Sequence, residues 1–376
     1  MSLGSLRRVV TEVAGTVKTS RRRRFARTVG DMDDLDLPLR RITHEPELAV
    51  SPVTAIPWPT EYRPKLLGYP RGQEPSDVAP LTPHDVLIVT WTSGEARTLA
   101  GLFGSDLDSW YEYRHDVASF VPKVTGARAP FNDDSAEMRR YYHSLGIYAP
   151  FMIGDISVLA LKSGLHMAYD GPDVPMVDLW KQLITEVRPK LVITTGTGGG
   201  IGADIGLGDV VIGAQARFHL TGSLKGKSYA SAAYPCTALD PTLEAKVLAL
   251  ATDDLLRPNG QKLSPPRVPK ILFSSSGIVS TDTFAFDDST NHYGLQGLGQ
   301  CCDMGDATLG LAISELGAAA PKWVAIRNAS DPQIQNTSGI AAAKKVAEQI
   351  YSRSQCLTTA GSVIASWATA IAVCGG

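Results

Sequence analysis

The chain has 376 residues, of which 44% are hydrophobic and 20% are charged, and its formal net charge is −2. This composition is typical of a globular protein and gives no overall bias toward nucleic acid or membrane binding. No apolar run reaches the roughly 18 residues that a membrane-spanning helix needs, and the five cysteines have no C-x-x-C spacing. We therefore expect a cytoplasmic protein without a transmembrane span, a disulfide framework or a zinc site.

The first 84 residues differ in character from the rest of the chain. Residues 1–50 carry a basic stretch, and residues 51–83 are rich in proline, which disfavours helices and favours an extended arm. We interpret the basic stretch as a solvated tail or a partner-docking arm rather than as a targeting sequence. The sequence thus predicts a basic, proline-rich N-terminal extension, residues 1–84, followed by a larger domain, residues 85–376.

A short apolar strand, Val86–Val89, opens the larger domain, and a helix follows it. Ser93 is the expected N-cap of this helix, and Glu95 lies in its first turn. Glu95 is therefore close to the carboxyl end of a strand, where the sites of open α/β sheets gather. The helix dipole alone also favours a carboxylate there, so a purely structural role stays open.

The segments that follow combine an aromatic, basic region with regular elements. Residues 108–150 are rich in aromatic and basic side chains, which are typical of a subunit interface and could also line a pocket for a base. Phe151–Lys162 and Gly164–Tyr169 are expected to form paired strands. Pro175–Val187 is an amphipathic helix that leads the chain into the next strand.

The centre of the predicted sheet is rich in glycine. It is expected to comprise a buried strand (Leu191–Thr195), a glycine-dense turn (Gly196–Gly202) and a second strand (Asp209–Ile212). Exposed backbone and nearby hydroxyl groups make this turn a candidate cradle for an anion or a sugar; the hydroxyls belong to Thr194, Thr195 and Thr197. No Rossmann or P-loop fingerprint is present, and a glycine-rich turn need bind nothing.

Strands and helices continue to alternate toward the C-terminus, which predicts an α/β fold with a central sheet. In chain order we expect a helix over Ala238–Leu256, a connection over Pro258–Pro269, a strand over Lys270–Ser274, a helix from Cys301, a strand over Trp323–Asp331, and one or two closing helices over Ile340–Tyr351 and Ser362–Val373.

Asp331, at the end of the last buried strand, is the strongest candidate for chemistry. A carboxyl group in apolar surroundings has a raised pKa and can act as a general acid. An Asp before a proline is also a common turn residue, so a structural role stays open. Arg327 could likewise pair with a buried carboxylate, and Phe284 could be an ordinary core residue.

Five motifs in a fixed order together resemble the nucleoside phosphorylase/nucleosidase superfamily over residues 85–350. They are T-S-G-E after the first strand, V-I-T-T-G-T-G-G-G with L-G-D-V-V-I, S-G-I-V-S-T-D-T-F, D-M-G-D-A, and R-N-A-S-D. The resemblance implies a three-layer α/β/α sandwich around a central mixed sheet, assembly into homo-oligomers, and cleavage of the N-glycosidic bond of a purine nucleoside or nucleotide.

The resemblance also implies roles for particular residues. Asp331, helped by Ser330, would protonate the purine as the general acid. The remaining substrate-binding residues would hold the base (Phe284, Ala285), lie under the ribose (Met304), or face the nucleophile (Gly196, Thr197, Gly198). Asp306 and Arg327 are also expected to bind the substrate. No cofactor or metal is expected, and neither membrane nor nucleic acid is expected as a partner.

The nucleophile could be water or phosphate. Phosphorylases of this superfamily carry an Arg near the glycine turn, and the corresponding residue here is Thr194, which cannot make a charge-assisted contact to phosphate. Glu95 falls where nucleosidases carry the Glu that activates water. We therefore predict hydrolysis, with phosphorolysis, in which phosphate is a co-substrate, as the alternative if another cation (Arg97, Arg139, Arg140 or a neighbouring subunit) binds phosphate.

One departure from the family concerns the sugar. The Met-Glu pair whose Glu binds the ribose hydroxyls is Met304-Gly305 here, so Asp303 or Asp306 would have to replace it. A substrate that lacks a hydroxyl, carries a 5′-phosphate or has a modified sugar is a second possibility. A third is a catalytically inactive nucleoside-binding module with a regulatory function.

Overall fold

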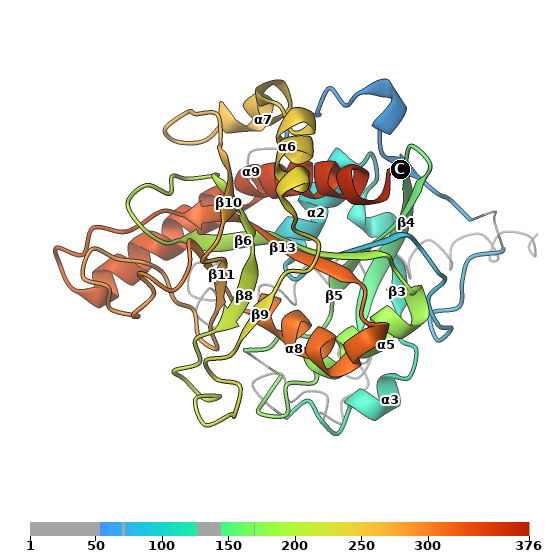
Figure 1. Ribbon diagram of the computed structural model, residues 1–376, viewed down its shortest axis with the longest axis horizontal. Coiled ribbons are helices and arrows are strands. Elements are labelled where there is room, and N and C mark those ends of the chain that lie inside the picture. The colour runs from blue at the N-terminus through green and yellow to red at the C-terminus, as the bar shows by residue number, and fades with distance from the viewer. Residues whose placement is uncertain (1–52, 70–71, 126–143, 169, 376) are drawn as a thin grey trace, which may run out of the picture.

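A computed structural model describes residues 53–69, 72–125, 144–168 and 170–375 of the chain (Figure 1). The basic stretch and Arg139 and Arg140 lie outside these residues. Within them, one sheet of 13 strands forms the middle layer. Parallel pairs such as β2 with β5 and antiparallel pairs such as β4 with β5 make this sheet mixed.

The strands follow one another in space in the order β1-β4-β5-β2-β6-β12-β11-β8-β9, with β3 beside β4, β13 beside β6 and β7, and β10 beside β7. Their bounds are β1 Lys65–Leu66, β2 Val86–Thr90, β3 Tyr111–Tyr113, β4 Gly146–Ile153, β5 Ile156–Ser163, β6 Leu191–Gly200, β7 Val210–Gly213, β8 Gln215–Phe218, β9 Ala233–Pro235, β10 Ile271–Ser274, β11 Ile278–Ser280, β12 Cys301–Asp303 and β13 Lys322–Asp331.

Helices cover both faces of the sheet, and each face has its own hydrophobic core (Figure 1). One core contains α2, α6, α7 and α9, and the other contains α5 and α8. The helices are α2 Ser93–Leu102, α3 Val117–Phe120, α5 Met176–Val187, α6 Pro241–Leu250, α7 Asp253–Gly260, α8 Asp306–Leu316 and α9 Ile340–Cys374. The predicted three-layer α/β/α sandwich around a central mixed sheet is confirmed.

Strand β6 does not stop where the sequence predicted. The glycines Gly196–Gly200 continue the strand instead of forming a turn, because β13 pairs with β6 as far as Gly199 and β12 pairs with Gly199 and Gly200. Glycine is required there by close neighbours rather than by a bend. A Cβ atom on Gly198 would lie 2.6 Å from the Cys301 sulfur, well inside van der Waals contact.

Several other predicted boundaries were wrong. The predicted paired strands were Phe151–Lys162 and Gly164–Tyr169, whereas the structure pairs β4 with β5 in a hairpin that turns at Gly154. Gly154 has a φ of +58°, which glycine adopts at little cost. The predicted helix Ala238–Leu256 is two helices, α6 and α7, and α7 extends past Pro258. Cys301–Asp303 is strand β12 rather than the start of a helix, because it pairs with β6 and β11.

The C-terminal helix α9 is continuous and buries several polar residues. Thr359 donates its hydroxyl to the carbonyl of Gln355, and Ser366 donates to that of Ser362, so these side chains find partners within the helix. Among the described residues, α9 is long and apolar enough by length and composition to cross a membrane, but 83% of its most apolar window is buried. It is accounted for as a core helix.

The described residues before β2 are packed against the sandwich. Trp58 donates its indole N–H to the carbonyl of Leu102 at 3.0 Å, and its ring lies 4.9 Å from that of Trp367 on α9. Trp367 in turn donates to the carbonyl of Tyr62. The division of the chain after residue 84 stays a prediction.

Candidate active site

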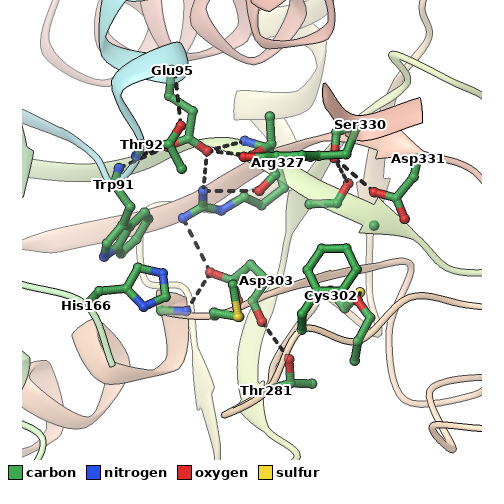
Figure 2. A pocket seen from close by; sticks show the side chains of 18 residues that line it. Trp91, Thr92, Glu95, His166, Thr281, Cys302, Asp303, Arg327, Ser330 and Asp331 are labelled. Atoms are coloured by element: carbon green, nitrogen blue, oxygen red, sulfur yellow. Dashed lines mark hydrogen bonds and ion pairs between the residues drawn. The ribbon is translucent and has the colours of Figure 1, made fainter. Parts of the chain in front are cut away.

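A cavity opens beside the ends of β2, β6, β12 and β13 (Figure 2). Because β2 and β13 run parallel to β6, their carboxyl ends meet at one edge of the sheet. The cavity holds about 660 Å³ of space between atoms, part of it open to solvent. It is lined by Trp91, Thr92, Glu95, His166, Thr197, Gly198, Gly199, Thr281, Phe284, Ala285, Cys302, Asp303, Met304, Gly305, Arg327, Ser330, Asp331 and Tyr351.

Most of the predicted site residues line this cavity together: Glu95, Thr197, Gly198, Phe284, Ala285, Met304, Arg327, Ser330 and Asp331. Gly196 does not line it, since it lies directly behind Glu95, and a Cβ atom there would be 2.2 Å from the Glu95 carboxyl carbon. Thr194 and Thr195, predicted to place hydroxyls beside exposed backbone, are fully buried in β6. Thr197 is the threonine of this strand that reaches the cavity.

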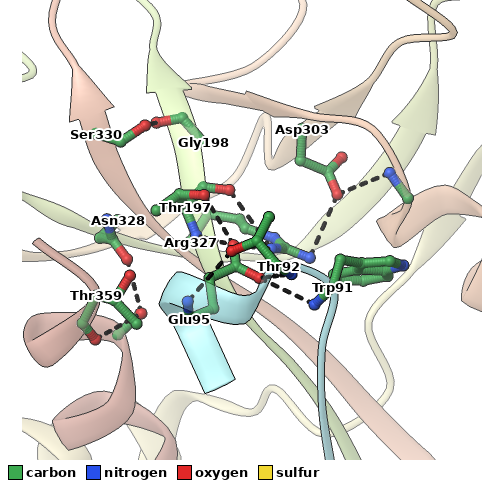
Figure 3. Close-up of polar contacts among 12 residues, drawn as sticks. Trp91, Thr92, Glu95, Thr197, Gly198, Asp303, Arg327, Asn328, Ser330 and Thr359 are labelled. Atoms are coloured by element: carbon green, nitrogen blue, oxygen red, sulfur yellow. Dashed lines mark hydrogen bonds and ion pairs between the residues drawn. The ribbon is translucent and has the colours of Figure 1, made fainter. Parts of the chain in front are cut away.

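Glu95 is held by four donors at the start of α2 (Figure 3). Its Oε2 accepts the backbone N–H groups of Trp91 and Thr92 at 2.9 and 3.0 Å. Its Oε1 accepts the backbone N–H and the hydroxyl of Thr197 at 2.6 and 2.8 Å. Thr92, not Ser93, is the N-cap, because Thr92 and Glu95 form a capping box. The carboxylate of Glu95 is therefore fixed between the first helix and the central strand.

Arg327 is buried beneath the cavity and surrounded by carboxylates. Its Nε and Nη2 donate to the two oxygens of Asp306 at 2.8 and 2.6 Å, and its Nη2 also lies 3.4 Å from Asp303. The guanidinium lies 4.2 Å from the ring centre of Trp91, a cation–π contact. Burial lowers the pKa of Arg327, but Asp306 and Asp303 outweigh it and raise the pKa, so the group stays charged.

Asp306, predicted to bind the substrate, does not reach the cavity. It is fully buried in the first turn of α8, and both of its oxygens bind Arg327. Its neighbour Asp303 lines the cavity instead. Burial raises the pKa of Asp303, and the charge of Asp306 raises it further, while Arg327 opposes both.

Asp331 occupies the other end of the cavity and has few partners. Its Oδ1 lies 3.0 Å from the hydroxyl of Ser330, which can donate its single proton either to Asp331 or to the carbonyl of Gly198 at 3.1 Å. Asp331 is only 3% exposed. Burial raises its pKa from 3.8 to about 7, although the Ser330 hydrogen bond lowers it. Near neutral pH this carboxyl group can therefore carry a proton.

The raised pKa of Asp331 predicts how stability depends on pH. The folded state holds this proton more tightly than the unfolded state, so the protonated carboxyl group contributes to the stability of the folded protein. This contribution is fully present below about pH 3.8, the ordinary pKa, and is lost as the pH rises through about 7, the pKa in the folded state. Asp331→Asn cannot ionise, so we expect it to be more stable than the wild type at about pH 8 by up to a few kcal/mol. Thermal unfolding at several pH values measures this difference, and parallel curves for the two proteins would contradict it.

Between the two ends, the wall of the cavity is partly apolar. Phe284, Ala285 and Met304 line it together with Cys302, whose thiol donates to the carbonyl of Ala285 at 3.4 Å. Burial raises the pKa of the Cys302 thiol well above its ordinary value, so it stays protonated. Such a surface suits a flat apolar ring rather than a charged group.

The residues that line the cavity but were not predicted as site residues include Trp91, His166, Cys302 and Tyr351. Trp91 directly follows β2, so the strand-end rule that selected Glu95 could have found it. Cys302 adjoins the recognised D-M-G-D-A motif. His166 and Tyr351 come from a loop and from α9, and nothing local in the sequence marks them.

The charged side chains of the cavity wall are mostly acidic. Glu95, Asp303 and Asp331 line it, with Arg327 as the cation among its described residues. Arg97, considered as a phosphate ligand, is exposed and does not line the cavity. In the part of the chain that the structure describes, no three His, Cys, Asp or Glu side chains are grouped to hold a metal ion.

A mixed sheet between two helical layers, with a cavity at the carboxyl ends of its strands, defines an α/β sandwich with a candidate site at one sheet edge. The family model described as Phosphorylase superfamily matches residues 153–361. More than half of the chain is covered, and the chain belongs to this superfamily of nucleoside phosphorylases and nucleosidases. A search of curated proteins found no match.

Solved structures with a similar chain path include two enzymes of Helicobacter pylori and one of Arabidopsis thaliana. Futalosine hydrolase of H. pylori is 13% identical, with a TM-score of 0.47 over 76% of this chain and 96% of that chain. The 5′-methylthioadenosine/S-adenosylhomocysteine nucleosidase of H. pylori is 12% identical, with a TM-score of 0.47 over 76% and 97%. The 5′-methylthioadenosine nucleosidase of A. thaliana is 16% identical, with a TM-score of 0.49 over 78% and 98%.

Proposed function

We propose that the protein hydrolyses the N-glycosidic bond of a purine nucleoside or nucleotide and releases the free base. The observation that carries this proposal is that Glu95 and Asp331 line one cavity, with the backbone of Thr197, Gly198 and Gly199 between them. Breaking this bond needs an acid on the side of the leaving base and a nucleophile at the sugar carbon. Asp331 can serve as the acid at the base, and Glu95 can assist the nucleophile at the sugar carbon.

Asp331 is the proposed general acid. A departing purine carries electrons that must be neutralised, and a proton delivered to a ring nitrogen does this. The pKa of Asp331, raised to about 7 by burial, leaves a large share of the group protonated at neutral pH. Phe284 and Ala285 would hold the base beside it.

Glu95 is the proposed partner of the attacking water. The hydroxyl of Thr197 donates to Glu95 Oε1, so the Thr197 oxygen can still accept a hydrogen bond from a water molecule in the cavity. A proton can then pass from the water through Thr197 to Glu95. The negative charge of Glu95 also favours the positive charge that develops on the sugar as the base departs.

The charges of the cavity argue against phosphate as the nucleophile. A dianionic phosphate would lie near Glu95 and Asp303, which repel it, and Arg327 is already neutralised by its bidentate pair with Asp306. Thr194, the residue where phosphorylases carry an Arg, is buried in β6. Water is uncharged, so the carboxylates do not repel it and it needs no cation to bind.

Incubation of the purified protein with purine nucleosides and nucleotides, with and without phosphate, tests the reaction. We expect free base to be released at equal rates under both conditions. The other product should be free sugar from a nucleoside or sugar 5-phosphate from a nucleotide, without the sugar 1-phosphate that phosphorolysis gives. Release that requires phosphate would identify a phosphorylase. Binding without any release would instead favour a regulatory module.

A further inference from the structure

The sugar end of the cavity contains an unusual contact between Trp91 and Gly305. A Cβ atom on Gly305 would lie 2.7 and 2.8 Å from two carbons of the Trp91 indole and 3.1 Å from its nitrogen. The backbone of Gly305 does not itself require glycine, because its φ of −164° is extended and open to any residue. Glycine is needed at this position because Trp91 occupies the space of a side chain.

Trp91 cannot easily turn away from Gly305. One face of its ring lies over the guanidinium of Arg327 at 4.2 Å, and Trp180 packs edge to face with it at 6.1 Å. Its backbone N–H is bound by Glu95. The indole is thus a fixed part of the cavity wall, at the end opposite Asp331 (Figure 2).

Few acceptors remain at this corner for the hydroxyl groups of a sugar. Asp303 is the cavity-lining carboxylate nearest to Gly305 in the chain, but its Oδ2 already accepts the N–H groups of Gly305 and Asp306 at 3.0 and 2.8 Å. Its Oδ1 accepts the hydroxyl of Ser280 at 2.6 Å, which leaves one lone pair. His166 also lines the cavity, but its Nδ1 accepts the N–H of Ala168.

We propose that Trp91 and Gly305 select a nucleoside whose sugar has one hydroxyl fewer than ribose. This inference rests on the proposed function for the placement of the sugar between the base and Glu95. Asp303 can accept a hydrogen bond from one hydroxyl. A second hydroxyl against the indole could accept the indole N–H of Trp91, which has no hydrogen-bond partner among the described residues, but its own proton would have no acceptor. A buried hydroxyl whose proton has no acceptor is unfavourable, whereas a CH₂ group packs well against an indole.

Adenine and guanine nucleosides with ribose, 2′-deoxyribose and 3′-deoxyribose test the inference. We expect kcat/KM of the wild type to be at least about tenfold higher for one deoxy sugar than for ribose, with a lower KM contributing. A 2′-hydroxyl also slows the departure of the base by electron withdrawal. The wild-type ratio is therefore compared with that of the double variant Trp91→Ala/Gly305→Glu, in which this intrinsic effect cancels.

The double variant replaces the indole with a carboxylate that can accept two hydroxyls. We expect its deoxy-to-ribose ratio to fall by about tenfold or more, while Trp91→Ala alone changes the ratio less. Circular dichroism and thermal unfolding identify variants that do not fold. If the variants fail to fold, the affinities of the wild type for the three sugars decide the question, because the electronic effect of the 2′-hydroxyl on bond cleavage does not enter a binding constant. A wild-type preference for ribose, or an unchanged ratio in a folded double variant, would overturn the inference.

Binding of the same nucleosides, measured by calorimetry, separates this inference from the proposed function. If no base is released but a deoxy sugar binds at least about tenfold more tightly than ribose, hydrolysis is wrong and the sugar selectivity holds. If base is released and ribose is preferred in both binding and kcat/KM, hydrolysis holds and the sugar selectivity is wrong.

Discussion

Asp331→Asn is expected to reduce kcat for base release by ~10²–10⁴-fold, the range over which a positioned general acid contributes. Asparagine has nearly the same shape and can still accept the hydroxyl of Ser330, but it cannot deliver a proton. The KM should change little, because the base would remain in contact with Phe284 and Ala285. Steady-state kinetics with a purine nucleoside measures both constants.

The pH profile distinguishes a general acid from a structural residue. Because the acid must be protonated, we expect the wild-type rate to fall as the pH rises through about 7, the pKa of Asp331. This fall should be absent from the residual activity of Asp331→Asn. Equal rates in the two proteins, or a profile that the substitution leaves unchanged, would rule out Asp331 as the acid.

Glu95→Gln is expected to lower kcat by a similar ~10²–10⁴-fold. Glutamine cannot accept the proton of the attacking water, and it has no negative charge to stabilise the positive charge that develops on the sugar. It should also lower stability by about 1–3 kcal/mol. Each oxygen of Glu95 accepts two hydrogen bonds from nearby groups. Glutamine has one side-chain oxygen, so the two donors that bind the other oxygen of Glu95 would lose their acceptor.

A stability control is therefore needed for Glu95→Gln. Asp240→Ala removes the N-cap of α6, where Asp240 accepts the N–H groups of Thr242 and Leu243, and Asp240 does not line the cavity. It should cost about 0.5–2 kcal/mol of stability without a loss of base release. If Asp240→Ala loses as much activity as Glu95→Gln at equal unfolding temperature, the effect of Glu95→Gln comes from stability alone.

The residues at strand ends could be predicted because a local pattern marks them. Glu95 and Asp331 each follow an apolar run, and the carboxyl ends of parallel strands meet at one edge of a sheet. That rule selected two residues that are far apart in the sequence and line one cavity in the structure. The layers of the fold were predictable for the same reason, since alternating strands and helices leave few arrangements.

The glycines of β6 were mistaken for a turn because glycine is rare within strands. Their strand conformation depends on pairing with β12 and β13, which come more than 100 residues later in the chain. Local sequence carries no signal for such pairing. The same glycines make room for Cys301, Cys302 and Asp331, neighbours that only the folded chain brings near.

The roles of Asp306 and Gly305 also depend on tertiary contacts. Asp306 could not be separated from Asp303 by sequence, because both flank Met304 and Gly305 at similar distances. The bidentate pair with Arg327 turns Asp306 away from the cavity. Glycine at position 305 is explained by Trp91, which occupies the space that a side chain there would need.

A crystal structure of Asp331→Asn with an uncleaved purine nucleoside is the most direct test of whether Glu95 and Asp331 act on one substrate. We expect the base to lie beside residue 331 and Phe284, with the sugar carbon that bears the base facing Thr197 and Glu95. A nucleoside bound outside this cavity, or bound with its glycosidic bond turned away from Glu95, would contradict the proposed hydrolysis.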